Sequence, residues 1–253
     1  MLIAVDIGNT NIHLGLFDLG GKGLVSHYTT RVTKGPLTDI SLDPLLLRKA
    51  TECILASVNP EAENALCNWL KSSGWTRTPL RVPTDVSIDM PVLLQNPENI
   101  GIDRLLNALA AFRRTGTSTI VVDAGTAITI DVISRKGEFM GGVITPGLPS
   151  LSEALHKRTA LLPEVSVRTP ASILGKDTNE AVTSGIYWGM AGAVEKITEK
   201  LLEELEDKPI ILATGGDAKL LAGATRVIDR VVPNLTLEGL LAAYSEHLSG
   251  KTA

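Results

Sequence analysis

A short pattern occurs twice in this chain and restricts its possible folds more than any other feature. In each copy an apolar strand ends in an aspartate, a glycine turn follows, and a second strand leaves the turn. The segments of the two copies, in chain order, are Leu2–Val5, Asp6-Ile7-Gly8-Asn9-Thr10-Asn11 and 12–17, then 119–122, Asp123-Ala124-Gly125-Thr126 and 127–133. The two aspartates lie about 117 residues apart. An internal echo at this distance predicts two related lobes that face one another.

The rest of the chain alternates between strand-like and helix-like segments, which predicts an α/β fold. The strands expected beyond the two copies are 24–31, 53–57, 80–82, 210–213 and 227–231. The expected helices are 42–50, 61–72, 103–114, 148–159, 179–206 (interrupted near Gly189), 217–222 and 236–248. Residues 83–99 and the Gly/Pro-rich segment 141–147 are expected to be loop and turn. The segment Thr115-Gly116-Thr117-Ser118 is the predicted boundary, giving lobes 1–115 and 116–253.

Composition excludes several classes of function. The chain has 253 residues and a net charge of −4, which gives no support for nucleic-acid binding. Cys53 and Cys67 are too few for a disulfide scaffold and lack metal-ligand spacing, and both are expected to be reduced and inert. The apolar start, residues 1–5, has the length of a buried strand and lacks the features of a signal peptide. No apolar run reaches the ~20 residues of a membrane span, and a cytoplasmic location is expected.

The two turns have the residue types that phosphoryl transfer requires. A glycine turn lets backbone N–H groups approach a phosphate, and Ser/Thr hydroxyls add further donors. An aspartate beside the turn can hold Mg²⁺ through water. A single turn of this kind is more often a hairpin tip with a solvated aspartate, but two copies at the ends of buried strands favour phosphate binding. The sequence has no GxxxxGK[ST] segment and no GxGxxG after a strand, which argues against P-loop and dinucleotide sites.

A third aspartate, in Gly101-Ile102-Asp103-Arg104, opens a predicted helix. One interpretation is a helix cap, since aspartate is common at helix N-termini. The other is that Asp103 accepts the proton of an acceptor hydroxyl, while Arg104 binds an anionic part of the substrate. The histidines His13, His27, His156 and His247 are scattered and are not expected to be catalytic.

Taken in order, these segments resemble the type III pantothenate kinases over residues 1 to about 245. The matching segments are Asp6 to Asn11, Gly101-x-Asp103-Arg104, Asp123 to Ala127, Gly141-Gly142 with Pro146-Gly147, Thr214-Gly215-Gly216, and Asn234 to Leu240. The resemblance implies two ribonuclease H-like lobes of the actin-like ATPase superfamily (acetate and sugar kinases, Hsp70, actin) with a cleft between them. It also implies transfer of the ATP γ-phosphate to pantothenate, the first step of coenzyme A synthesis, by a homodimer that needs Mg²⁺ or a similar divalent cation and K⁺ or NH₄⁺.

Carried over by position, the resemblance gives each residue a role. Asp103 would be the catalytic base and Asp123 would bind the monovalent cation. ATP would be bound by Asp6, Ile7, Gly8, Asn9, Thr10, Asn11, Ile12, His13 and Thr126. Pantothenate would be bound by Gly101, Ile102, Asp103 and Arg104, and by Thr178 from the partner side. One departure affects this pocket, since Leu94 stands where the family often has a tyrosine.

Two other functions fit parts of the pattern. A related small-molecule kinase could use another alcohol or a carboxylate as acceptor, although the cysteine-rich zinc motif of repressor-related sugar kinases is absent from the sequence. A non-catalytic regulator or accessory factor could keep the fold without turnover. The absence of a helix-turn-helix segment and of a basic patch, and the presence of all three aspartates, favour the enzyme.

Overall fold

The computed structural model divides the chain into two compact units. The residues that the structure describes are 1–20, 23–32, 37, 40 and 44–251. The first unit contains Met1–Met90, Asn96–Arg113 and Thr236–Ala253, and the second contains Pro91–Gln95 and Arg114–Leu235. The units therefore place the C-terminal helix with the first half of the chain, whereas the predicted lobes 1–115 and 116–253 place it with the second half. The lobe boundaries themselves stay a prediction.

The first unit is built on a five-stranded sheet in the order β3-β2-β1-β4-β5. Its strands are β1 (Leu2–Ile7), β2 (Asn11–Asp18), β3 (Gly23–Arg31), β4 (Glu52–Ser57) and β5 (Leu80–Val82). The central strand β1 pairs antiparallel with β2 and parallel with β4, and its apolar residues are buried on both faces. The continuous apolar run at the start of the sequence is explained by this central position.

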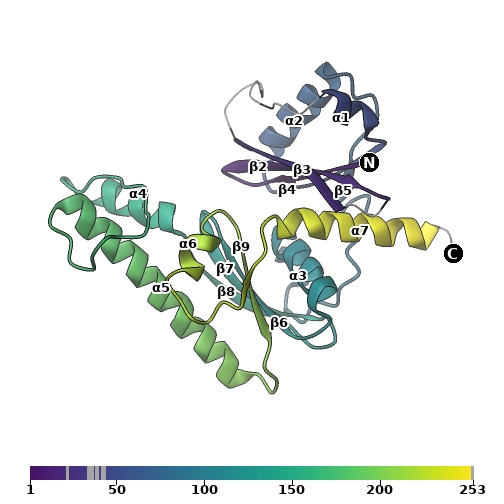
Figure 1. Cartoon of the computed structure of the whole chain (residues 1–253). Helices are drawn as coiled ribbons and strands as arrows, with labels where there is room; N and C mark the ends of the chain where they lie inside the picture. The colour runs from purple at the N-terminus through teal and green to yellow at the C-terminus, as the bar shows by residue number, and fades with distance from the viewer. Residues whose placement is uncertain (21–22, 33–36, 38–39, 41–43, 252–253) are drawn as a thin grey trace. The chain divides into compact units, whose positions relative to one another are not determined.

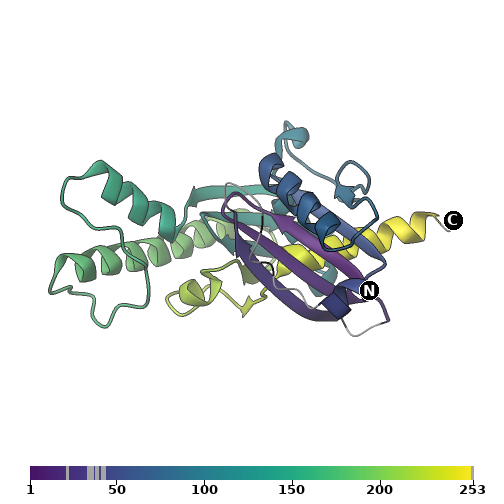
Figure 2. The same ribbon diagram turned by 90° about the horizontal axis from the view of Figure 1, so that it is seen from above.

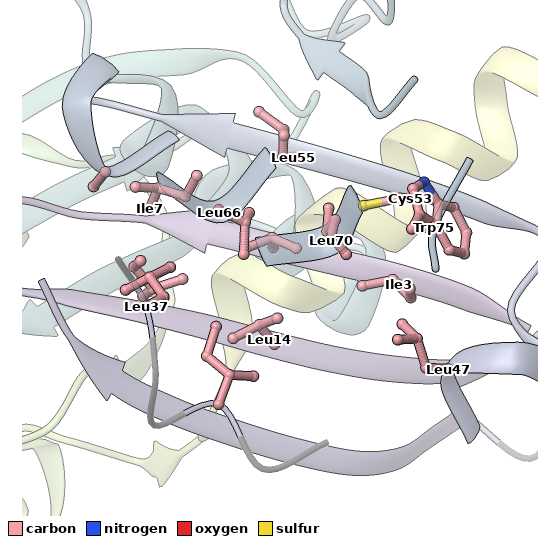
Figure 3. Close-up of a cluster of buried hydrophobic side chains, with 14 of the residues drawn as sticks. Ile3, Ile7, Leu14, Leu37, Leu47, Cys53, Leu55, Leu66, Leu70 and Trp75 are labelled. Atoms are coloured by element: carbon pink, nitrogen blue, oxygen red, sulfur yellow. The ribbon is translucent and has the colours of Figure 1, made fainter. Parts of the chain in front are cut away.

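The first unit also contains four helices and a 3₁₀ turn among its described residues. They are α1 (Pro44–Lys49), α2 (Pro60–Ser72), the 3₁₀ turn Pro97–Asn99, α3 (Ile102–Thr115) and α7 (Leu235–Lys251). Asn59 caps α2 through a 3.1 Å bond from the Ala62 N–H to its side-chain oxygen. Leu66 and Leu70, one turn apart on α2, pack on the sheet residues Ile3 and Leu55 (Figure 3). Part of the expected helix 42–50 lies outside the described residues.

The C-terminal helix α7 packs against α3 and β2. A Cβ at Gly239 would lie 2.2 Å from the Leu106 carbonyl oxygen, so only glycine permits this approach of the two helices. The Thr236 hydroxyl donates a 2.9 Å bond to the side chain of Asn107, which is buried. On the sheet side, a Cβ at Gly15 would lie 3.0 Å from Leu237 Cδ1. These contacts explain why α7 belongs to the first unit.

The second unit repeats the same sheet order. Its strands are β6 (Thr119–Ala124), β7 (Ala127–Ile133), β8 (Phe139–Pro146), β9 (Ile210–Thr214) and β10 (Arg230–Val231), arranged β8-β7-β6-β9-β10. In both sheets the first strand is central, pairs antiparallel with the second and parallel with the fourth. The predicted α/β fold with two related halves is thereby confirmed.

Three helices cover one face of the second sheet: α4 (Leu148–Arg158), α5 (Thr178–Glu204) and α6 (Ala218–Ala222). Figures 1 and 2 both show α4 running alongside α5. The expected interruption of α5 near Gly189 is wrong, because the helix is continuous through that residue. Of the helices in the described residues, none is both long and apolar enough to cross a membrane.

Two further expectations are wrong. The segment 141–147 was expected to be a turn, but residues up to Pro146 form β8, which pairs with β7 over its length. Gly142 is a glycine because Asp131 of the neighbouring strand β7 lies very close to it: a Cβ at Gly142 would lie 2.3 Å from Asp131 Oδ1. The last strand, expected over 227–231, is limited to β10.

Candidate active site

The first turn joins β1 to β2 in the first unit and contains the predicted ATP-binding segment, residues 6–13. Asp6 pairs with His13 and Ile7 with Ile12, and the Gly8 N–H donates a 2.9 Å bond to the Asn11 carbonyl to close the turn. Asn9 and Thr10, at the tip, are exposed. A turn of this kind leaves small and polar groups at the end of a rigid sheet, where a ligand can reach them.

The paired strands sort this segment into two faces. Ile7 and Ile12 are fully buried in the core of the first unit. Asp6 and His13, paired across the strands, share the opposite face and are half-buried. Burial lowers the pKa of His13, and the neighbouring His27 lowers it further. At neutral pH the aspartate of the turn therefore has an uncharged imidazole beside it.

Asp103 lies in the first turn of α3 and folds back onto it. Its Oδ1 accepts a 2.9 Å bond from the Arg104 N–H, and that N–H is also 3.1 Å from the Gly101 carbonyl. A Cβ at Gly101 would lie 2.5 Å from Asp103 Oδ1, which explains the glycine of this segment. Gly101, Ile102, Asp103 and Arg104 are all half-buried. One oxygen of Asp103 thus binds the next backbone N–H inside the first turn of the helix, and its role as a base stays a prediction.

The second turn joins β6 to β7 in the second unit and contains Asp123 and Thr126. The Gly125 N–H donates a 3.0 Å bond to the Ala127 carbonyl, which closes a turn similar to the first. Here, however, two other loops bind the same turn. The Thr126 carbonyl accepts bonds from the Gly147 N–H at 2.9 Å and from the Ser150 hydroxyl at 2.6 Å. The Ala124 carbonyl accepts a 3.0 Å bond from the Asp217 N–H.

Glycines make this convergence of three loops possible. A Cβ at Gly147 would lie 2.0 Å from the Gly125 carbonyl oxygen. Gly215 has φ +92°, and a Cβ there would lie 2.5 Å from Asp123 Oδ1 and 2.4 Å from the Ala124 oxygen. Neither position accepts a side chain without a shift of the backbone. The close approach places an aspartate carboxylate among backbone groups, which suits a site for a cation or a phosphate.

Two acidic residues near the second turn were missed by sequence reasoning. Asp217, in the loop after β9, is half-buried, and this burial raises its pKa. Asp131 is buried on β7, where its Oδ2 accepts a 3.1 Å bond from the Thr129 hydroxyl. Thr129 is the partner of Asp123 across the strands, so Asp123 and Asp131 share a face of the sheet. The alternation of Thr129 and Asp131 along an apolar strand was the available signal.

Thr178 begins α5, at one end of a groove between α4 and α5. The groove has a volume of about 840 Å³, and its lining is mostly apolar, with Lys176, Asp177 and Thr178 as its polar part. Asp177 caps the helix by accepting a 2.9 Å bond from the Glu180 N–H. The preceding loop is held close, because a Cβ at Gly175 would lie 2.4 Å from the Ala181 nitrogen.

The predicted site residues therefore form four groups. Residues 6–13 and 101–104 belong to the first unit, whereas Asp123 with Thr126, and Thr178 at its groove, belong to the second. Leu94, the departure from the family pattern, packs in the second unit, 3.5 Å from where a Cβ of Gly141 would lie. Its segment is bound to the edge of β8, since the Leu93 N–H donates to the Phe139 carbonyl at 2.8 Å.

Two sheets of one topology, each with an acid and a glycine turn between its first two strands, form the duplicated α/β architecture of the actin-like ATPase fold. Solved structures support this fold. A Baf family protein from Campylobacter jejuni is 20% identical, with 98% of this chain and 99% of that chain covered and a TM-score of 0.57. Component A of the (R)-2-hydroxyglutaryl-CoA dehydratase of Acidaminococcus fermentans is 13% identical, with 96% and 95% covered and a TM-score of 0.54.

Sequence comparison identifies the family. The profile described as "Type III pantothenate kinase" matches residues 2–200. The type III pantothenate kinase of Geobacter sulfurreducens is 37% identical, with 98% of this chain and 99% of the relative covered. That of Moorella thermoacetica is 38% identical, with 98% and 100% covered. The chain belongs to the type III pantothenate kinase family.

Proposed function

We propose that this chain is an ATP-dependent kinase that transfers the γ-phosphoryl group to the 4′-hydroxyl of pantothenate, the first step of coenzyme A biosynthesis. The observation that carries the proposal is the family match along residues 2–200, together with both acid–glycine turns at the ends of equivalent strands. A cytoplasmic location, where ATP is available, belongs to the same proposal.

In this proposal both turns bind phosphate groups of ATP. The first turn supplies residues 6–13, whose tip exposes Asn9 and Thr10 and whose Gly8 keeps the backbone close to a ligand. The second turn supplies Thr126. Because phosphoryl transfer requires little covalent chemistry from the protein, backbone and hydroxyl donors held on rigid strands provide most of what is needed.

Asp103 is the proposed base. Its Oδ1 is held by the Arg104 N–H at 2.9 Å, so the carboxylate has a fixed orientation at the start of α3. Such a carboxylate can accept the proton of the pantothenate hydroxyl as the oxygen attacks the γ-phosphorus. The Arg104 guanidinium carries the charge that suits the pantothenate carboxylate. Gly101 and Ile102 complete this part of the proposed pantothenate site.

The cations of the proposal have suitable donors. Asp123 Oδ1 lies where the loop after β9 approaches the second turn through Gly215, and a carboxylate oxygen suits K⁺ or NH₄⁺. Mg²⁺ prefers water, phosphate and one or two carboxylates, which the nucleotide and the aspartates of the turns can provide. When bound, these ions would neutralise the developing charge on the phosphates.

A homodimer is also proposed, and the groove between α4 and α5 supports it. The groove is mostly apolar, and large apolar side chains such as Leu155 and Trp188 are exposed nearby on the same helices. A second copy of the chain would remove these surfaces from water. Thr178 opens onto this groove, so the partner subunit would lie beside a residue of the proposed pantothenate site.

The test replaces Asp103 and measures ADP release that depends on pantothenate. Asp103→Asn keeps the size of the side chain and removes the base, so kcat is expected to fall about 10²- to 10⁴-fold. ATP affinity, measured by calorimetry, should stay within about threefold. Asp89→Asn is the matched control, because Asp89 is an exposed carboxylate of the same unit. Full activity of Asp103→Asn, or wild-type turnover with other acceptors but not with pantothenate, would contradict the proposal.

A further inference from the structure

A chain of hydrogen bonds joins His13, Thr29 and His27 on the surface of the first sheet. His13 Nδ1 lies 3.0 Å from the Thr29 hydroxyl oxygen, and the same oxygen lies 3.2 Å from His27 Nε2. The two imidazole rings are stacked, with centroids 5.9 Å apart and an interplanar angle of 7°. These residues lie on two different strands, and no sequence motif connects them.

The register of the strands explains the arrangement. His13 on β2 is the direct partner of Thr29 on β3, and His27 on β3 is the partner of Gly15 on β2. His13 and His27 therefore lie on the same face of the sheet, diagonal to each other on neighbouring strands, and their rings stack.

The same row of residues reaches the first turn. Asp6 on β1 is the partner of His13, so Asp6, His13 and Thr29 stand side by side across three strands on one face. His13 is thus one strand away from the acid of the turn that we propose for phosphate binding. Thr29 and His27 are one step further out, on the edge strand β3.

The chemistry of a hydroxyl limits how the protons can be placed. A threonine hydroxyl has one proton, so it donates to one ring and accepts from the other. Burial lowers the pKa of both histidines, and the neighbouring His27 lowers that of His13 further. If His27 Nε2–H donates to Thr29 and Thr29 donates to His13 Nδ1, the proton of His13 is on Nε2. If His13 Nδ1–H instead donates to Thr29 and Thr29 donates to His27, His13 Nε2 carries no proton and is an acceptor.

We propose that Thr29 and His27 are positioning residues for the nucleotide: they fix His13 with its proton on Nε2, where it donates a hydrogen bond to a phosphate oxygen of ATP at the first turn. A bound phosphate selects this direction of the hydrogen bonds, because an N–H donor at His13 Nε2 is favoured beside a phosphate oxygen and an acceptor is not. The inference rests on the proposed function, since it requires ATP at this turn.

The experiment compares Thr29→Val, which removes the hydroxyl at nearly constant shape, with Thr29→Ser, which keeps it. The ATP KM and the calorimetric ATP affinity of Thr29→Val should weaken about three- to tenfold, as expected for one hydrogen bond. Its kcat and pantothenate KM should stay within about twofold, and Thr29→Ser should restore most of the ATP affinity. Thr30→Val is the control, because Thr30 pairs with Ile12 and therefore lies on the opposite face.

A double-mutant cycle separates positioning from a structural role. His13→Phe removes the proposed donor, so adding Thr29→Val to it should weaken ATP binding no further. His27→Phe keeps a stacked ring and loses the N–H, and its ATP KM should rise as in Thr29→Val. Equal losses in the valine and serine variants, or a full Thr29→Val effect in the His13→Phe background, would overturn the inference.

The same measurements separate this inference from the proposed function. A wild-type chain that binds ATP but does not phosphorylate pantothenate would refute the function, and the ATP affinities of the variants would still decide the role of Thr29 and His27. A wild-type chain that binds no ATP would overturn both.

Discussion

The two acid–glycine turns have the same place in equivalent sheets but are built differently. The first, Asp6 to Asn11, is closed by its own Gly8–Asn11 bond, and its tip residues are exposed. The second, Asp123 to Ala127, is bound by two further loops through Gly147 and through Gly215 with Asp217. One topology therefore supports a turn that presents side chains and a turn that is fixed by backbone contacts.

This difference indicates what each turn can tolerate. Beside the second turn, the spaces that a methyl group on Gly147 or Gly215 would enter are already filled by oxygens of the turn at 2.0 to 2.5 Å. In the first turn the nearest such oxygen, that of Asn11, is 3.2 Å from a Cβ on Gly8. Substitution of Gly147 or Gly215 should damage the fold around the second turn, whereas substitution of Gly8 should mainly weaken ligand binding at the first turn.

The largest effect is expected for Gly215→Ala. The new methyl group would meet Asp123 Oδ1 and the Ala124 oxygen, and alanine at φ +92° is strained, so the loop must move. We expect a loss of about 2–4 kcal/mol in the free energy of unfolding and a fall in kcat/KM of more than about 100-fold. Denaturant unfolding and steady-state kinetics measure the two effects.

Gly216→Ala is the matched control for that substitution. A Cβ at Gly216 would meet no atom of the described residues within 4 Å. Its stability should therefore stay within about 0.5 kcal/mol of the wild type. Similar losses of stability in Gly215→Ala and Gly216→Ala would show that the loop tolerates no alanine, whether or not the methyl group meets Asp123.

A smaller effect is expected for Gly8→Ala in the first turn. The Asn11 carbonyl need move only a few tenths of an ångström, so the free energy of unfolding should change by less than about 1 kcal/mol. The methyl group would hold the backbone away from a phosphate, and the ATP KM should rise about three- to tenfold. If Gly8→Ala lost as much stability as Gly215→Ala, the two turns would not differ in how tightly neighbouring backbone constrains them.

The smallest effect is expected for Asp217→Asn, and it depends on pH. Burial raises the pKa of Asp217 in the folded state, so its charged form costs stability. This cost is absent below the ordinary carboxyl range and appears as the pH rises through the raised pKa. Asparagine should therefore increase the free energy of unfolding at pH 7, by less than about 1 kcal/mol because solvent screens a half-exposed group. The gain should disappear near pH 3.

The measurement is a urea titration of both proteins at pH 7 and at about pH 3. A gain that persists undiminished at the lower pH would contradict the assignment of the cost to the Asp217 charge. A loss at pH 7 would mean that the carboxylate has a favourable partner.

Much of the fold could be predicted because its signals are local. The central strands β1 and β6 are continuous apolar runs, and each ends in Asp-x-Gly, so both hairpins and the duplicated topology follow from sequence alone. Helix α2 begins at Asn59-Pro60 and has apolar residues one turn apart, which are ordinary helix signals. The aspartates of both turns, and Asp103 at a helix start, were found in the same way.

The remainder depends on contacts between distant segments. Gly141 and Gly142 resemble a turn in the sequence but belong to β8, because the second is required by Asp131 on the neighbouring strand. The position of α7 in the first unit follows from its packing on α3 through Gly239. The His13–Thr29–His27 chain depends on strand register, which the sequence does not specify for a half-exposed edge strand.

The most direct test of the account follows the terminal phosphoryl group of ATP. Wild-type protein is mixed with γ-³²P-labelled ATP, Mg²⁺, K⁺ and excess pantothenate, and the products are separated after one turnover. We expect the label to be recovered in 4′-phosphopantothenate. Label that stays in ATP, or that appears only as inorganic phosphate, would contradict it.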